Sequence, residues 1–278
     1  MPLKVNLRAL LIVIATLLVT VSATPLVHRA YDGQAWMLDS YEVVASKQPS
    51  EVLEKAFETK LTLVLGKPLE MGRSNDGVYE MTTFEGKDAT KMICKVMKDK
   101  NNAALGEVLA LTKVGGFIKS GLCLIRHEEK PCIVMKKVEG KILNKHIGYK
   151  QASDHEKVEL KQAAINKACD QTARLGEEKR IFHYDNNLSN VCITMKDEEA
   201  ASSRKVRRTS PKSSPSQASS FSKPPPIVST ALLCDWSASQ TFVVAESATY
   251  KQIYEYCTKR WTPENWKVIS DETVFSFD

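Results

Sequence analysis

The spacing of apolar residues changes about halfway along this chain, from a strand pattern to a helix pattern. Between residues 65 and 138, short apolar runs alternate with glycines and polar turns, which indicates β-strands. Residues 102–114 interrupt them with helical spacing. Between residues 154 and 178, apolar residues recur every three or four positions, which predicts a long helix. We therefore expect an α+β protein in which five antiparallel strands and one helix precede a mainly helical half.

Two segments at the N-terminus are expected to lie outside this core. Residues 1–23 have basic residues, a short apolar run and a final Val-Ser-Ala, which is typical of a signal peptide cleaved after Ala23. The run is too short to cross a bilayer as a helix, so an uncleaved anchor is the less favoured alternative. Residues 24–62 are interpreted as a loosely held leader, followed by a helix that Ser50 caps and that runs to Leu61.

The seven cysteines lie mostly within apolar, strand-like runs rather than in evenly spaced pairs. In such runs, cysteine behaves as a small buried hydrophobic residue. We expect mostly unpaired core thiols, with one or two disulfides and at least one cysteine left over. There is no CxxC or Cys/His spacing that would indicate zinc.

The net charge of +6 comes from one segment. Residues 200–226 contain nine Ser, five Pro, six Lys or Arg and no acidic residue. This composition cannot bury enough apolar surface to fold, so the segment is predicted to be a disordered insertion. The rest of the chain is balanced, which argues against a specific nucleic-acid-binding surface. The basic run at 204–208 and the residues after it fit a nuclear-localisation-like cluster, a contact with an anionic surface, a phosphorylation target at Ser210 and Ser214, or a solvated charge run.

Polar motifs in both halves suggest one chemistry. Residues 183–190 read HYDNNLSN, and Asp235 follows the apolar run 227–233. In the first half, Lys95 lies in an apolar strand and Glu107 lies on the helix after it. Phosphoryl transfer needs a carboxylate near the attacking hydroxyl, a cation near the phosphates and a metal ion held by oxygen ligands.

In this order, the motifs resemble those of the protein-kinase-like superfamily over roughly residues 66–240, with features similar to its aminoglycoside phosphotransferase-like branch. The resemblance implies a two-lobed fold. Its N-lobe, residues 63–150, would hold five antiparallel strands and one helix. A reduced, mainly helical C-lobe, residues 151–278, would carry the basic insertion at 200–226. The resemblance also implies ATP and Mg²⁺ as cofactors.

The resemblance assigns the nucleotide contacts to the first half. A glycine-rich loop over the phosphates is matched by Gly72, Ser74 and Gly77, with serine in place of the middle glycine. The adenine-holding strand and hinge are matched by Met135 and Val138. Each match has a plain alternative, because the glycines also fit a hairpin turn and residues 132–143 also fit an edge strand with a turn.

The resemblance assigns the catalytic groups and the metal ligands to both halves. Lys95 would contact the α- and β-phosphates and pair with Glu107. Asp185 would accept the proton of the attacking hydroxyl or orient that hydroxyl. Asn190 and Asp235 would hold Mg²⁺. His183 is interpreted as a structural residue beneath this loop.

Two functions compete at this stage. The first is a secreted ATP-dependent phosphotransferase that acts on the hydroxyl of a protein or a small molecule. The second is a catalytically inactive, pseudokinase-like secreted effector that binds a partner such as a host protein, with a host cell as its destination. The short chain after Asp235, Ser74 in place of the middle glycine, a glycosylation sequon at Asn187 and the scarcity of ATP outside cells favour the second.

Overall fold

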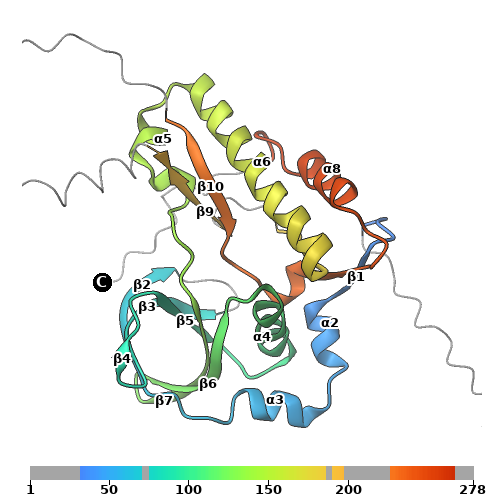
Figure 1. The fold of residues 1–278 in the computed structure, drawn as a ribbon. Helices are drawn as coiled ribbons and strands as arrows, with labels where there is room; N and C mark the ends of the chain where they lie inside the picture. Colours follow the sequence, from blue (N-terminus) through green and yellow to red (C-terminus); the bar gives the residue numbers. More distant parts are fainter. Residues whose placement is uncertain (1–31, 71–74, 186–189, 197–225, 267–278) are drawn as a thin grey trace, which may run out of the picture.

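The computed structural model describes residues 32–70, 75–185, 190–196 and 226–266. These residues form three antiparallel sheets and six α-helices, which confirms the α+β class. The largest sheet lies at the lower left of Figure 1, and helices α6 and α8 with the β9–β10 pair lie above it. The predicted signal peptide, residues 1–23, and nearly all of the predicted insertion at 200–226 fall outside the described residues.

The first half forms the largest sheet, with the strand order β2-β3-β5-β7-β6. All five predicted strands are present, and a short β4 pairs with β3. The bounds are β2 Leu63–Glu70, β3 Asn75–Phe84, β4 Lys87–Asp88, β5 Met92–Met97, β6 Phe117–Ile125 and β7 Glu128–Lys136. The predicted helix at 102–114 is α4, Asn102–Val114, where Asn101 caps the first turn and Gly115 ends the helix in a left-handed conformation.

The sheet buries both of its faces. Along β7, Cys132 and Val134 belong to one apolar cluster, whereas Ile133 and Met135 belong to the main core shared with α4 and the second half. This division follows from the alternation of side chains along a strand. On β5, Cys94 belongs to the same cluster as Cys132 and Val134. Its neighbour Lys95 therefore lies on the opposite face of the sheet, toward the second half of the chain.

The second half is built around one long helix. Helix α6, Asp154–Lys179, confirms the predicted helix at 154–178, and a capping box between Ser153 and Glu156 begins it. The predicted apolar stripe is its buried face. The remaining elements are α5 Ile147–Gln151, β8 Ile181–His183, β9 Val191–Met195, β10 Val228–Leu233, β11 Thr241–Val244 and α8 Tyr250–Arg260. None of the described helices is long and apolar enough to cross a membrane.

The segment before the first sheet differs from the predicted leader and helix. Its described part contains β1 Met37–Ser40 and α2 Tyr41–Ser46, and β1 pairs with β11 of the second half. Helix α3, Ser50–Ala56, is shorter than predicted, and Pro49 rather than Ser50 precedes its first turn. The helix stops because the backbone at Thr59 and Leu61 exchanges hydrogen bonds with Leu122 of β6 instead of continuing the helix.

Two disulfides are present, so the prediction of mostly unpaired thiols is wrong while the number of disulfides is as predicted. Cys123–Cys132 joins β6 to β7, and Cys169–Cys257 joins α6 to α8. Cys94 is a buried thiol beside the first pair, and burial raises its pKa to about 12. The spacing of the cysteines gave no sign of the second pair, because helix packing alone brings its two residues together.

The connection between the halves passes close to β9. Lys141 and Ile193 exchange two backbone hydrogen bonds of 2.9 and 2.8 Å. Gly140, just before them, has a φ of +111°, and a Cβ atom there would lie 2.6 Å from the carbonyl oxygen of Ile193. Only glycine combines this φ with such a close approach.

Gly140→Ala is expected to lower the free energy of unfolding by about 2–3 kcal/mol, because it adds a steric clash to backbone strain. Urea denaturation would measure the loss. Gly86→Ala is the matched control, since Gly86 has a φ of +76° and no atom within 4 Å of the added Cβ. That variant should show the strain alone, about 1 kcal/mol. Equal losses in both variants would show that the contact with Ile193 has no role.

Candidate functional site

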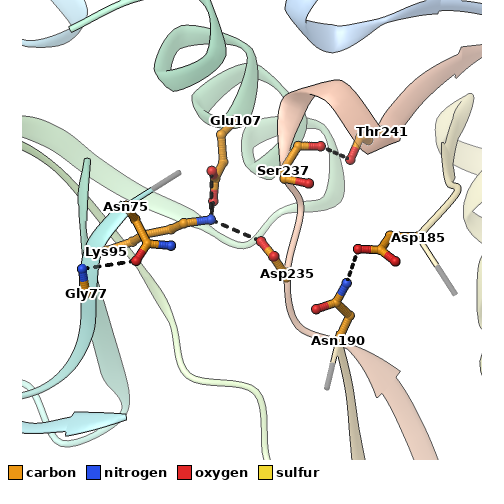
Figure 2. Close-up of polar contacts among 9 residues, drawn as sticks. All are labelled: Asn75, Gly77, Lys95, Glu107, Asp185, Asn190, Asp235, Ser237 and Thr241. Atoms are coloured by element: carbon orange, nitrogen blue, oxygen red, sulfur yellow. Dashed lines mark hydrogen bonds and ion pairs between the residues drawn. The ribbon is translucent and has the colours of Figure 1, made fainter. Parts of the chain in front are cut away.

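Lys95 connects three elements that lie far apart in the sequence (Figure 2). Its Nζ atom donates to both carboxylate oxygens of Glu107, at 2.8 and 2.9 Å, and to Oδ1 of Asp235 at 3.0 Å. Lys95 comes from β5, Glu107 from α4 and Asp235 from the segment after β10. The structure therefore brings together three of the predicted site residues where the two halves meet.

Burial and charge act in opposite directions on these groups. Lys95 is 4 % exposed and Glu107 is 2 % exposed. Burial lowers the pKa of Lys95, but the two carboxylates more than offset it, so that the net pKa is raised and the amine stays charged. Burial raises the pKa of Glu107, and Lys95 opposes this only in part.

Asp235 differs from Glu107 in being accessible. Its side chain is 39 % exposed. Burial of the group acts to raise its pKa, but the charge and the hydrogen bond of Lys95 outweigh this, and the net pKa lies below its usual range. Asp235 is therefore a charged carboxylate with one oxygen bonded to Lys95, and it can accept a further ligand from the open side.

Asp185 and Asn190 form a second polar pair beside Asp235 (Figure 2). Nδ2 of Asn190 donates to Oδ2 of Asp185 at 2.7 Å. Asn190 immediately precedes β9, and its carbonyl oxygen accepts a 2.9 Å hydrogen bond from the backbone N–H of Cys234. The antiparallel pairing of β9 with β10 thus places Asn190 next to Asp235.

His183 lies close to the two acidic residues Asp235 and Asp185. It is fully buried and stands edge-on to Trp236, with ring centroids 5.4 Å apart. Burial lowers the pKa of His183, and the charges of Asp235 and Asp185 oppose this only in part. The imidazole is therefore held neutral at pH 7, which fits the predicted structural role.

No protein-family model matches this chain, and no curated protein matches it. The five polar side chains and their positions in the fold are therefore what indicates a function.

The predicted nucleotide contacts are described only in part. Gly77 has a φ of +135°, its N–H donates to Oδ1 of Asn75 at 3.0 Å, and the ring of Tyr79 lies where a Cβ atom would project. Gly72 and Ser74 lie outside the described residues. The two predicted hinge residues lie on either side of the end of β7. Met135, within the strand, is buried in the main core, and Val138, in the connection after it, is half-buried.

Sequence reasoning missed two residues that support this site. Oδ1 of Asn75 orients the Gly77 backbone, and Oε1 of Gln171 accepts a 2.8 Å hydrogen bond from the N–H of Leu233, just before Asp235. Gln171 lies on α6 beside the buried stripe, but its partner comes from a distant strand. A polar residue next to an apolar stripe was the only signal, and it does not identify the partner.

Proposed function

We propose that this chain has a two-lobed protein-kinase-like fold and is a secreted phosphotransferase that binds ATP with Mg²⁺. The order of elements supports the fold: an antiparallel sheet of five main strands and the short β4, with α4 between β5 and β6, then a connection, and then the long helix α6. The observation that carries the proposal is that the Lys95 ammonium group forms ion pairs with both Glu107 and Asp235. A buried lysine held in this way is a fixed cation at the junction of the two halves.

The residues present fit the cofactors. Asp235 offers an exposed carboxylate and Asn190 an amide next to it, and oxygen donors of this kind suit Mg²⁺. When bound, Mg²⁺ would neutralise charge on the β- and γ-phosphates. Lys95, fixed by Glu107, would attract the α- and β-phosphates, with Gly77 and the hinge around Met135 and Val138 as the other nucleotide contacts.

Asp185 would serve the acceptor in this reaction. As the acceptor hydroxyl oxygen bonds to the γ-phosphorus, the bond to ADP breaks and the hydroxyl proton passes to the Asp185 carboxylate. The 2.7 Å hydrogen bond from Asn190 fixes one oxygen of that carboxylate. The acceptor is proposed to be a protein or a small molecule with a free hydroxyl group.

Nucleotide binding is the first test. ATP with Mg²⁺ or Mn²⁺ should raise the thermal midpoint, because a ligand at 100 times its Kd stabilises a protein by about 2.7 kcal/mol. Asp235→Asn should remove the shift. Asp170→Asn should retain it, because Asp170 lies on α6 and bonds only to Tyr250 and Arg174 among the described contacts. A wild-type protein that shows no shift with either metal would contradict the proposal.

Transfer is the second test. With ATP labelled at the γ-phosphate, Asp185→Asn should bind nucleotide normally and lose about 10²–10⁴-fold in transfer or hydrolysis. Transfer that survives this change would show that Asp185 is not the base.

A second candidate function is a pseudokinase-like secreted effector that binds a partner without catalysis, such as a protein of a host cell. The sequence features that favour it are the glycosylation sequon at Asn187, within the proposed catalytic loop, and Ser74 in place of the middle glycine of the loop over the phosphates. Folded protein that binds no nucleotide would support this candidate.

A further inference from the structure

A cluster of polar and aromatic side chains connects the N-terminal segment to the HYDNNLSN motif. Oδ2 of Asp32 accepts three hydrogen bonds: from the hydroxyl of Tyr256 at 2.6 Å, from the hydroxyl of Tyr184 at 3.2 Å and from Nη1 of Arg260 at 3.2 Å. Tyr256 and Arg260 lie on α8, and Tyr184 immediately precedes Asp185. One carboxylate therefore joins three separate segments.

The cluster is held together by charge as well as by hydrogen bonds. The guanidinium carbon of Arg260 lies 3.7 Å from the centroid of the Tyr184 ring, a cation–π contact. The hydrogen bond from Tyr256, followed by those from Tyr184 and the charge of Arg260, outweighs desolvation and holds the pKa of Asp32 below its usual range. Asp32 is therefore a carboxylate at neutral pH.

Asp32 is anchored by the segment that follows it. Trp36 is 7 % exposed and stands edge-on to Phe182 and Tyr256, with ring centroids 5.2 and 5.5 Å apart. Strand β1 begins at the next residue, Met37, and pairs with β11. The carboxylate is thus presented by a chain segment that is packed into the core on the side of α8.

Tyr184 is restrained from four directions. Its backbone N–H donates to the carbonyl oxygen of Gln240 at 2.8 Å. Its hydroxyl donates to Asp32, its ring face meets Arg260, and its ring is roughly perpendicular to that of Phe242, with the centroids 5.7 Å apart. A side chain held at its backbone, hydroxyl and ring fixes the φ and ψ angles of the loop at that point, and therefore the direction of the next residue, Asp185.

We propose that Asp32 is a positioning residue for Asp185, acting through Tyr184 with the help of Arg260. The inference rests on the proposed phosphotransferase function, because it assigns the proton acceptor of that reaction. Asp32 touches neither nucleotide nor acceptor in this assignment. Its effect is on where the Asp185 carboxylate points, and so on the rate of transfer rather than on the binding of ATP.

Asp32→Asn keeps the shape of the side chain and removes its charge. We expect kcat for transfer to fall by about 10- to 100-fold, while KM for ATP changes less than twofold, because Lys95, Glu107 and Asp235 are not touched. Asp32→Glu, which restores the carboxylate, should recover part of kcat. Tyr256→Phe removes the shortest hydrogen bond but leaves the charge, so its loss should be smaller and in the same direction.

Asp170→Asn is the matched control. Asp170 also bonds a tyrosine hydroxyl, that of Tyr250 at 2.8 Å, and an arginine, Arg174 at 3.0 Å. It has no described contact with Tyr184, so kcat should stay at the wild-type value even if stability falls. An Asp32→Asn variant with unchanged kcat, or one in which KM rises while kcat is kept, would overturn the proposal.

Hydrogen exchange separates this inference from the proposed function. In the protein without nucleotide, amides at 181–185 should exchange faster in Asp32→Asn than in wild type, and at the wild-type rate in Asp170→Asn. This result supports the positioning of Asp185 even if no nucleotide binds. Unchanged exchange at 181–185 in Asp32→Asn would overturn the inference, whether or not the chain binds ATP.

Discussion

Replacing Lys95 with methionine is expected to lower the free energy of unfolding by about 3–5 kcal/mol and to remove the nucleotide-induced thermal shift. Lys95 is bonded to both oxygens of Glu107, and both side chains are almost fully buried. Without the ammonium group, Glu107 remains in the core with no compensating charge. Urea denaturation with linear extrapolation would measure the loss.

The size of this loss should depend on pH in a defined direction. Burial already raises the pKa of Glu107, and Lys95 opposes the effect in part. Removing Lys95 therefore raises the pKa of Glu107 further in the folded state. A carboxyl group whose pKa is higher in the folded than in the unfolded state destabilises the fold at pH values above its unfolded-state pKa. Because the pKa of Glu107 in the wild-type fold is already above the usual carboxyl range, the extra loss from Glu107 should be small up to that raised pKa and grow as the pH rises above it.

An exposed ion pair on the same sheet supplies the control. Lys137 and Glu80 lie 2.7 Å apart, with their side chains 39 % and 36 % exposed. Lys137→Met should cost no more than about 1 kcal/mol, because solvent screens such pairs. Combining Lys95→Met with Glu107→Leu should restore much of the stability, since no buried carboxylate at position 107 then remains. A Lys95→Met variant that loses no more than Lys137→Met would contradict the structural importance of the buried pair.

Removing the disulfide between α6 and α8 is the second large effect. Cys169 and Cys257 are separated by 88 residues, and closing a loop of this length in the unfolded chain corresponds to about 4–5 kcal/mol of stability. Changing both residues to alanine should lower the free energy of unfolding by about that amount. Denaturation in urea without reductant would measure the difference.

The other disulfide tests the dependence on loop length. Cys123 and Cys132 are separated by nine residues, so the corresponding double alanine variant should lose only about 2–3 kcal/mol. All four cysteines are buried, and the side-chain volume removed is the same in both variants. An equal or larger loss for the short loop would show that packing, rather than loop closure, determines the contribution of these bonds.

Elements with strong local patterns could be predicted from the sequence. The stripe of Leu160, Ala164, Ile165 and Ala168 has helical spacing, and helix α6 begins at the predicted residue. The five strands of the first sheet were equally clear because glycines and polar turns separate them. For the site, the order of the motifs along the chain was enough to predict the candidate residues Lys95, Glu107, Asp185, Asn190 and Asp235. The hydrogen bonds between them are known only from the fold.

What the sequence could not indicate depends on contacts between distant segments. Residues 37–46 have no strong apolar period, because β1 and α2 are both too short to show one. Helix α2 is held by its contact with α4. The cluster around Asp32 joins residues from both ends of the described chain. The sequence around these tyrosines and this aspartate does not indicate a cluster, because both residue types are also common on solvent-exposed surfaces.

The pairing of β1 with β11 has a consequence for the order in which the protein folds. Met37 pairs with Val244, so the first described strand leaves the ribosome long before its partner has been made. The small sheet of the second half cannot close during most of synthesis, and a contact of such sequence separation forms slowly. Until then β1 is an unpaired strand with a row of free backbone groups. A nascent chain arrested before β11 should therefore be open to proteolysis near Met37, although the first sheet is already complete.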